Sequence, residues 1–297
     1  MRQISIKSRA KINITLDVIG KRPNGYHDMC MIMQTVNLYD MVYIRKMHVQ
    51  GIKLKANLKW LPNDESNIAY KAAELFKETY GIETGISIEL NKRIPVAAGL
   101  AGGSSNAAAV LVGMNHLFDT QVKKEELMKL GISLGADVPY CVLRGTALAE
   151  GIGDILTPLP PIPHCYVLLA KPKISVSTAT VFRDLNLSGG IDHPPTDKVI
   201  QAIKEKDINT IAGNMGNVLE TVTVKRHPVI TTIKNTMLEY GALGAIMSGS
   251  GPTVFGLYKS KNEAYKAAHK LKLESLVRDV FVTTMYNRRE GAQSYER

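Results

Sequence analysis

A glycine-rich run at residues 95–105 constrains the fold of this chain more than any other feature. It reads Pro-Val-Ala-Ala-Gly-Leu-Ala-Gly-Gly-Ser-Ser, follows an alternating stretch at 86–91 that predicts a strand, and precedes an alanine-rich stretch at 104–117 that predicts a helix. Glycine lets the backbone adopt positive φ and approach a ligand closely. The unpaired N–H groups at a helix start attract anions, and Ser104 and Ser105 would add hydroxyl donors and a helix cap. The run therefore predicts a phosphate-binding loop between a strand and a helix.

The spacing of the glycines separates this loop from two common nucleotide-binding motifs. It is not a Walker A loop, because the chain contains no GxxxxGK[ST], and GLAGGSS does not fit the dinucleotide pattern GxGxxG. A tight strand-to-helix turn that binds nothing is the alternative for any single glycine-rich loop. Three glycines within five residues, followed by two serines, favour phosphate binding.

The chain length and one proline cluster predict two domains. A chain of 297 residues can form two cores, and the four prolines at 158–163 exclude a helix or a central strand. We therefore expect domains at 1–160 and 161–297. The first half predicts a pair of strands within 2–19, further strands at 29–47 and 51–57, and helices at 67–80, capped by Asp64 or Ser66, and at 123–134. The second half predicts strands at 165–170 and 280–285, a strand–loop–strand at 245–258 and a helix at 262–273.

Composition and charge narrow the class of protein. The net charge is +10, and residues 1–60 contain eleven Lys or Arg but only three Asp or Glu. Such a positive field attracts nucleic acid, a membrane surface or phosphorylated metabolites. The three cysteines and seven histidines are dispersed, so we expect no disulfide framework and no transition-metal site. No apolar run is long enough for a membrane span or a signal peptide, and we expect a cytoplasmic protein.

Three further motifs carry residues of possible chemical function. Lys11 lies in an apolar alternation, where it needs an anionic partner unless it faces water at a strand edge. Asp137 lies among apolar residues before a proline, and its alternative role is that of a turn or capping residue. A second Gly/Ser loop, Ser248, Gly249, Ser250 and Gly251, would either cover a polyanion or form a hairpin.

Taken together and in this order, the motifs resemble those of the GHMP kinases, the family of galactokinase and of the homoserine and mevalonate kinases. The matching segments are KSRAKIN at 7–13, RPNGYH at 22–27, the glycine-rich run, GADVP at 135–139 and SGSGP at 248–252. The resemblance covers almost the whole chain. It implies an α+β fold of two domains, the first with mixed β-sheets and packed helices and the second a ferredoxin-like α/β sandwich, with the active site in the cleft between them.

The resemblance also implies a reaction. Members of the GHMP kinase family transfer the γ-phosphoryl group of ATP to an alcohol. Within the family, the AKIN and PNGYH segments resemble the branch that acts on a cytidine diphosphate-linked polyol in the non-mevalonate route to isoprenoid precursors. Asp137 matches the catalytic base and Lys11 its partner. Mg²⁺ is expected with ATP, held largely by phosphate oxygens. The residues implied to bind ATP are Pro95, Val96, Ala97, Ala98, Gly99, Leu100, Ala101, Gly102, Gly103, Ser104, Ser105 and, near the adenine or ribose, Asn67.

On the substrate side, the resemblance assigns roles to five residues. Tyr26 would stack on cytosine, His27 would form hydrogen bonds to it, and Phe182 would cover its opposite face. Thr178 would contact the substrate, and Asn13 would bind the polyol. Without the resemblance, ordinary half-buried packing is the better interpretation of the two aromatic residues.

One position departs from the pattern, and several alternatives stay open. Asn106 stands where the family loop more often has Asp, which argues against an essential acidic role but not against ATP binding. A GHMP kinase for another alcohol, such as mevalonate or homoserine, is the second hypothesis. A nucleic-acid-binding protein is the third, although charge alone supports it. We expect no nucleic acid or membrane partner, and a monomer or weak homodimer.

Overall fold

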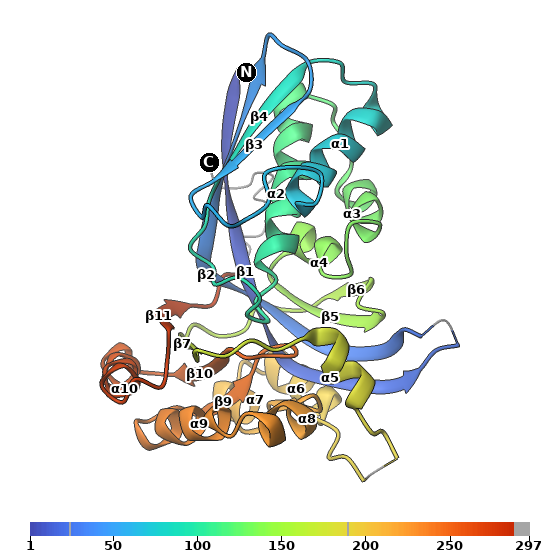
Figure 1. The fold of residues 1–297 in the computed structure, drawn as a ribbon. Helices are drawn as coiled ribbons and strands as arrows, with labels where there is room; N and C mark the ends of the chain where they lie inside the picture. The colour runs from blue at the N-terminus through green and yellow to red at the C-terminus, as the bar shows by residue number, and fades with distance from the viewer. Residues whose placement is uncertain (24, 189, 288–297) are drawn as a thin grey trace.

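The computed structural model describes residues 1–23, 25–188 and 190–287 and contains two β-sheets (Figure 1). The first is a seven-stranded mixed sheet in the order β3-β4-β2-β1-β8, with β5 pairing to β2 and β6 to β5. Its strands are β1 (Gln3–Lys21), β2 (His27–Met47), β3 (Ile52–Ala56), β4 (Gly85–Asn91), β5 (Thr146–Gly151), β6 (Ile155–Pro158) and β8 (Gly216–Asn217). Asn24 of the 22–27 motif lies outside the described residues.

The second sheet has four antiparallel strands in the order β11-β7-β10-β9. They are β7 (Tyr166–Lys171), β9 (Gly244–Met247), β10 (Val254–Tyr258) and β11 (Asp279–Thr284). Helices lie between β7 and β9 and between β10 and β11, which gives the expected ferredoxin-like sandwich. The α+β fold with two kinds of sheet is confirmed.

Helices complete both halves of the molecule. In the first half α1 to α4 lie on one face of the mixed sheet (Figure 1). The helices are α1 (Ile68–Tyr80), α2 (Gly102–Phe118), α3 (Lys124–Ile132), α4 (Val138–Leu143), α5 (Thr178–Asp184), α6 (Thr196–Lys204), α7 (Ile208–Gly213), α8 (Glu220–Arg226), α9 (Val229–Glu239) and α10 (Lys261–Leu273). Within the described ranges, no helix combines the length and the apolar character that crossing a membrane requires.

The first strand corrects the expected pair of strands within 2–19. β1 is one continuous strand, because its pairing with β2 absorbs extra residues at register shifts on either side of residues 11–13. Each such bulge exchanges the faces of the strand. As a result Ile12 packs into a different core cluster from Ile6 and Leu16, and its neighbours Lys11 and Asn13 lie on the opposite face of the strand.

Two predicted helix caps are also wrong. Asn67, not Asp64 or Ser66, caps α1, because its Oδ1 accepts a hydrogen bond from the Ala69 N–H at 3.0 Å. At the glycine-rich loop, α2 begins before the serines, and Ala101 occupies the cap position with φ 54° and no side-chain hydrogen bond. The first turn of α2 therefore leaves its backbone N–H groups without a side-chain cap.

Candidate active site

Two adjoining clefts meet at the glycine-rich loop. The larger, of about 670 Å³, lies between β1, β2, α4 and α5, and the smaller, of about 390 Å³, lies beside α1 and the start of α2. Gly99, Ala101 and Ser104 line both clefts. The smaller cleft is also lined by Pro95, Val96, Ala97, Ala98, Gly102, Gly103 and Asn67. The loop thus separates two compartments and is exposed to each.

The second Gly/Ser loop packs directly on the first. It connects the antiparallel strands β9 and β10, so it is a hairpin loop, and its Ser248 hydroxyl donates a hydrogen bond to the Gly99 carbonyl at 3.0 Å. Gly99 has φ +73°, and a Cβ there would lie 2.2 Å from the Ser248 carbonyl oxygen. Only glycine fits at that position. Of this loop, Gly249 and Ser250 line the larger cleft.

Lys11 lies where three segments converge. Its Nζ is 3.8 Å from Asp137 Oδ2 and donates to Asn13 Oδ1 at 2.8 Å. Its backbone N–H donates to the Leu100 carbonyl at 3.2 Å, and a Cβ on Gly249 would be 3.7 Å from its Nζ. The lysine is buried in an anionic and polar setting, so the alternative of a water-facing edge lysine is excluded.

Asp137 is placed at the start of α4 without acting as a cap. It occupies the N-cap position, but its side chain accepts no backbone hydrogen bond there. Its carboxylate instead faces the larger cleft and is 36% exposed. Because the Asp137 carboxylate caps no helix and is open to a cleft, it is available to a ligand. The interpretation of Asp137 as a capping residue is therefore wrong.

The far end of the larger cleft carries the aromatic residues. The rings of His27 and Phe182 have centroids 5.1 Å apart at 36°, and Tyr26 beside them is 59% exposed. Burial, and secondarily the charge of Lys21, lowers the pKa of His27 below 6.5. The hydroxyls of Thr178 and Ser250 are 2.8 Å apart. This end offers flat apolar surfaces with neutral hydrogen-bonding groups.

Three of the predicted binding residues do not face either cleft. Leu100 is buried in the core. The Ser105 hydroxyl donates to the Arg9 carbonyl at 2.6 Å, because it points toward β1 and not toward the loop. Asn13 is buried, and its Nδ2 lies 3.5 Å from the Met31 sulfur. Asn13 thus adjoins the larger cleft through Lys11 and Met31, which both line it.

Around the larger cleft, sequence reasoning missed two cations and a residue that supports the second Gly/Ser loop. Lys21 and Arg183 line the larger cleft. Both adjoin a motif residue in the sequence, the 22–27 motif and Phe182 respectively, so their position was the available signal. Asn217 donates to the carbonyls of Met247 and Gly249, both at 2.8 Å, and so holds the second Gly/Ser loop. No local pattern indicates that role.

Comparison with known proteins gives consistent matches. The family model described as "GHMP kinases N terminal domain" matches residues 67–145, and "GHMP kinases C terminal" matches 199–275. A protein of Lachnoclostridium phytofermentans named 4-diphosphocytidyl-2-C-methyl-D-erythritol kinase is 53% identical over 283 residues, which are 95% of this chain and 97% of that protein.

Solved structures agree with these matches. A crystal structure of 4-(cytidine 5'-diphospho)-2C-methyl-D-erythritol kinase superposes with a TM-score of 0.82 at 30% identity, over 96% of this chain and 100% of that one. A homoserine kinase from Cytophaga hutchinsonii has a TM-score of 0.78 at 22% identity, over 96% and 95% of the two chains. The second likeness concerns the fold alone.

Proposed function

The chain belongs to the GHMP kinase family, in the branch of the 4-diphosphocytidyl-2-C-methyl-D-erythritol kinases, and we propose that its two clefts hold the two substrates on either side of the glycine-rich loop. It phosphorylates 4-diphosphocytidyl-2-C-methyl-D-erythritol with ATP. The alternatives of a mevalonate or homoserine kinase and of a nucleic-acid-binding protein have no support beyond shared fold and charge.

One observation carries the assignment of the clefts. Lys11 Nζ and Asp137 Oδ2, 3.8 Å apart, line the larger cleft next to the loop residues shared with the smaller one. ATP in the smaller cleft would direct its terminal phosphate toward this pair. The cytidyl end of the other substrate would reach Tyr26, His27 and Phe182, and its diphosphate would pass Lys21.

In this arrangement the groups of the site divide the tasks of phosphoryl transfer, a reaction that depends on positioning and charge stabilisation. Asp137 accepts the proton of the attacking 2-hydroxyl. The Lys11 ammonium holds Asp137 and stabilises charge on the transferred group. The uncapped N–H groups of α2 and the loop bind the phosphate oxygens. Thr178, linked to Ser250, helps to position the polyol.

Mg²⁺ fits this cleft as a partner of ATP more than as a resident ion. Nowhere in the described part of the chain do three or more His, Cys, Asp or Glu side chains gather as a metal site. Mg²⁺ accepts oxygen ligands and usually keeps substrate phosphates among them. We propose that phosphate oxygens would provide most of its ligands and that the Ser104 hydroxyl is available beside them. Mg²⁺ held in this way would neutralise phosphate charge.

The cellular location, the domain boundary and the oligomeric state are further proposals. Cys30, Cys141 and Cys165 are free thiols, which suits the cytoplasm. The division at 160/161 follows the end of β6 at Pro158, although β8 from the second half pairs with β1. We propose a monomer or weak homodimer.

Steady-state transfer from ATP to 4-diphosphocytidyl-2-C-methyl-D-erythritol tests the two central residues. We expect Asp137→Asn and Lys11→Met each to lower kcat by about a thousandfold, within the usual range for a general base, with both KM values little changed. Asp207→Asn, at the start of α7 outside the cleft, is the matched control and should leave kcat intact. If Asp137→Asn kept most of the activity of the unaltered chain, the base would have to be another group.

A further inference from the structure

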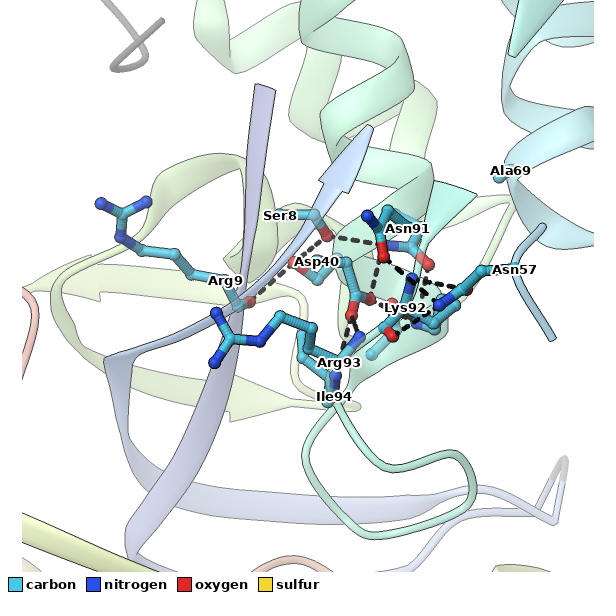
Figure 2. Close-up of polar contacts among 12 residues, drawn as sticks. Ser8, Arg9, Asp40, Asn57, Ala69, Asn91, Lys92, Arg93 and Ile94 are labelled. Atoms are coloured by element: carbon cyan, nitrogen blue, oxygen red, sulfur yellow. Dashed lines mark hydrogen bonds and ion pairs between the residues drawn. The ribbon is translucent and has the colours of Figure 1, made fainter. Parts of the chain in front are cut away.

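Beneath the glycine-rich loop, a buried polar cluster joins the mixed sheet to both ends of that loop (Figure 2). We call it the Asp40 cluster; it consists of Ser8 on β1, Asp40 on β2, Lys92 after β4 and Asn106 on α2. The exposed fractions are 0% for Ser8 and Asp40, 8% for Lys92 and 2% for Asn106. Nothing in the assigned chemistry of the site uses these four side chains.

Asp40 binds the end of the loop that follows strand β4. Its Oδ1 accepts hydrogen bonds from the backbone N–H groups of Arg93 at 2.6 Å and Ile94 at 2.8 Å, immediately before the loop begins at Pro95. Its Oδ2 accepts from Lys92 Nζ and, at 2.9 Å, from Asn106 Nδ2. All four bonds end on one carboxylate that a central strand of the sheet holds in place.

Lys92 and Asn106 connect the same carboxylate to the helix-side end. Lys92 Nζ donates to Asn106 Oδ1 at 2.8 Å and to the Gly102 carbonyl at 3.4 Å, in the first turn of α2. Asn106 Nδ2 also donates to Ser8 Oγ at 2.8 Å. The two ends of the loop, at residues 94 and 102 with seven residues between them, are thereby fixed to one carboxylate.

The charges explain the amide at position 106. The cluster contains one carboxylate and one ammonium in direct contact, and Asn106 bonds to both, donating to Asp40 and accepting from Lys92. An Asp at 106 would bring a second carboxylate within hydrogen-bonding distance of the first and remove the donor to Asp40 and Ser8. Two buried carboxylates facing one ammonium repel each other.

We propose that Asp40, Lys92 and Asn106 are positioning residues for ATP: they fix the glycine-rich loop so that its N–H groups meet the phosphates. The inference rests on the proposed function, in which that loop binds ATP. It also makes Asn106 a required neutral partner of Asp40. Lys92 and Asn106 also line the smaller cleft. We assign all three residues an effect through the loop, and none of them a contact with the reacting atoms.

An exchange of the side chains of Asp40 and Asn106 tests the proposal. Asp40→Asn leaves two amides, and Asn106→Asp leaves two carboxylates, beside Lys92. We expect each to raise the KM for ATP by about tenfold or more, since small displacements at a site have effects of this size. The KM for the cytidyl substrate should stay within about twofold, because its subsite lies in the other cleft. The double variant Asp40→Asn/Asn106→Asp restores one carboxylate and one amide and should recover most of the ATP affinity.

Controls separate positioning from general damage. Asp207 also accepts two backbone hydrogen bonds, from Asn209 at 3.0 Å and Thr210 at 3.2 Å, outside the cleft, so Asp207→Asn should leave both KM values unchanged. Thermal unfolding identifies variants that lose the fold; if Asp40→Asn is one of them, Asn106→Asp and the double variant carry the test. Equal effects on both KM values, or a double variant as impaired as the two single effects combined, would overturn the proposal.

A loop variant distinguishes this proposal from the proposed function. A Cβ on Gly103 would have ordinary contact with Ile68 Cγ2 at 3.6 Å, so Gly103→Ala fits the fold but places a methyl group on the smaller cleft. Its control is Gly213→Ala in α7, where no atom lies within 4 Å. If Gly103→Ala leaves the KM for ATP unchanged, the loop is not the phosphate site. If Gly103→Ala raises it while the Asp40 cluster variants do not, only the positioning role is wrong.

Discussion

In the proposed site, His27 would make binding of the cytidyl substrate depend on pH. Its lowered pKa keeps the ring neutral at pH 7, with one nitrogen as donor and the other as acceptor, which suits a base edge. As pH falls through that lowered pKa, the ring gains a proton, loses its acceptor and adds a positive charge near Lys21. We therefore expect the KM for the cytidyl substrate to be constant above pH 6.5 and to rise below it.

Two variants make the pH profile specific to His27. Lys21→Met removes the lesser of the two causes that lower the pKa of His27 and leaves its burial, so the rise in KM should begin somewhat closer to pH 6.5. His27→Gln, which cannot titrate, should have a higher KM that no longer depends on pH in this range. A rise in KM centred above pH 6.5 in the unaltered chain would contradict the assignment.

At the scale of elements, the contact between the two glycine loops should decide whether the site forms. Gly99→Ala places a methyl group at positive φ and against the Ser248 carbonyl, so it should displace the phosphate loop and lower kcat/KM by about a hundredfold. Gly81, the C-cap of α1, also has positive φ (+63°) but has no atom within 4 Å of a built Cβ. Gly81→Ala therefore carries only the backbone cost of about 1–2 kcal/mol.

Urea unfolding and steady-state kinetics of the two variants separate the clash from the backbone strain. Gly81→Ala should lose stability but keep its kinetic constants, whereas Gly99→Ala should lose both. Equal kinetics in the two variants would show that the second Gly/Ser loop does not set the position of the first.

The same elements show where sequence periodicity succeeds and where it stops. Strand and helix positions around the glycine-rich loop follow from alternation and alanine content, and α2 and β4 lie close to the predicted ranges. The face of β1 on which Lys11 lies cannot be predicted in this way, because an alternating pattern does not reveal where β-bulges occur. Nor can the direction of Ser105, whose hydroxyl has a backbone acceptor on β1 available 96 residues away in sequence.

At the scale of the molecule, the candidate site depends on residues that only the tertiary fold brings together. The resemblance correctly indicated the family, and the fold brings Lys11 and Asp137 together. Asp40, however, is locally a single charge within a largely apolar strand. Its partners Lys92 and Asn106 follow 52 and 66 residues later. Because one sequence does not reveal such pairings, the loop motif was visible and its support was not.

The charge of the whole molecule gives a last prediction, on the rate of substrate capture. The net charge is +10, and Lys21 and Arg183 line the larger cleft, while both substrates are polyanions. Raising KCl from about 0.05 M to about 0.5 M shortens the Debye length and should lower kcat/KM for the cytidyl substrate by about three- to tenfold.

Lys21→Gln should lower kcat/KM at low salt and weaken its salt dependence. Lys266→Gln, which removes an exposed charge from α10 outside the cleft, should leave the salt dependence as it is. An equal effect of the two substitutions would mean that total charge, and not the cations of the cleft, sets the rate of capture.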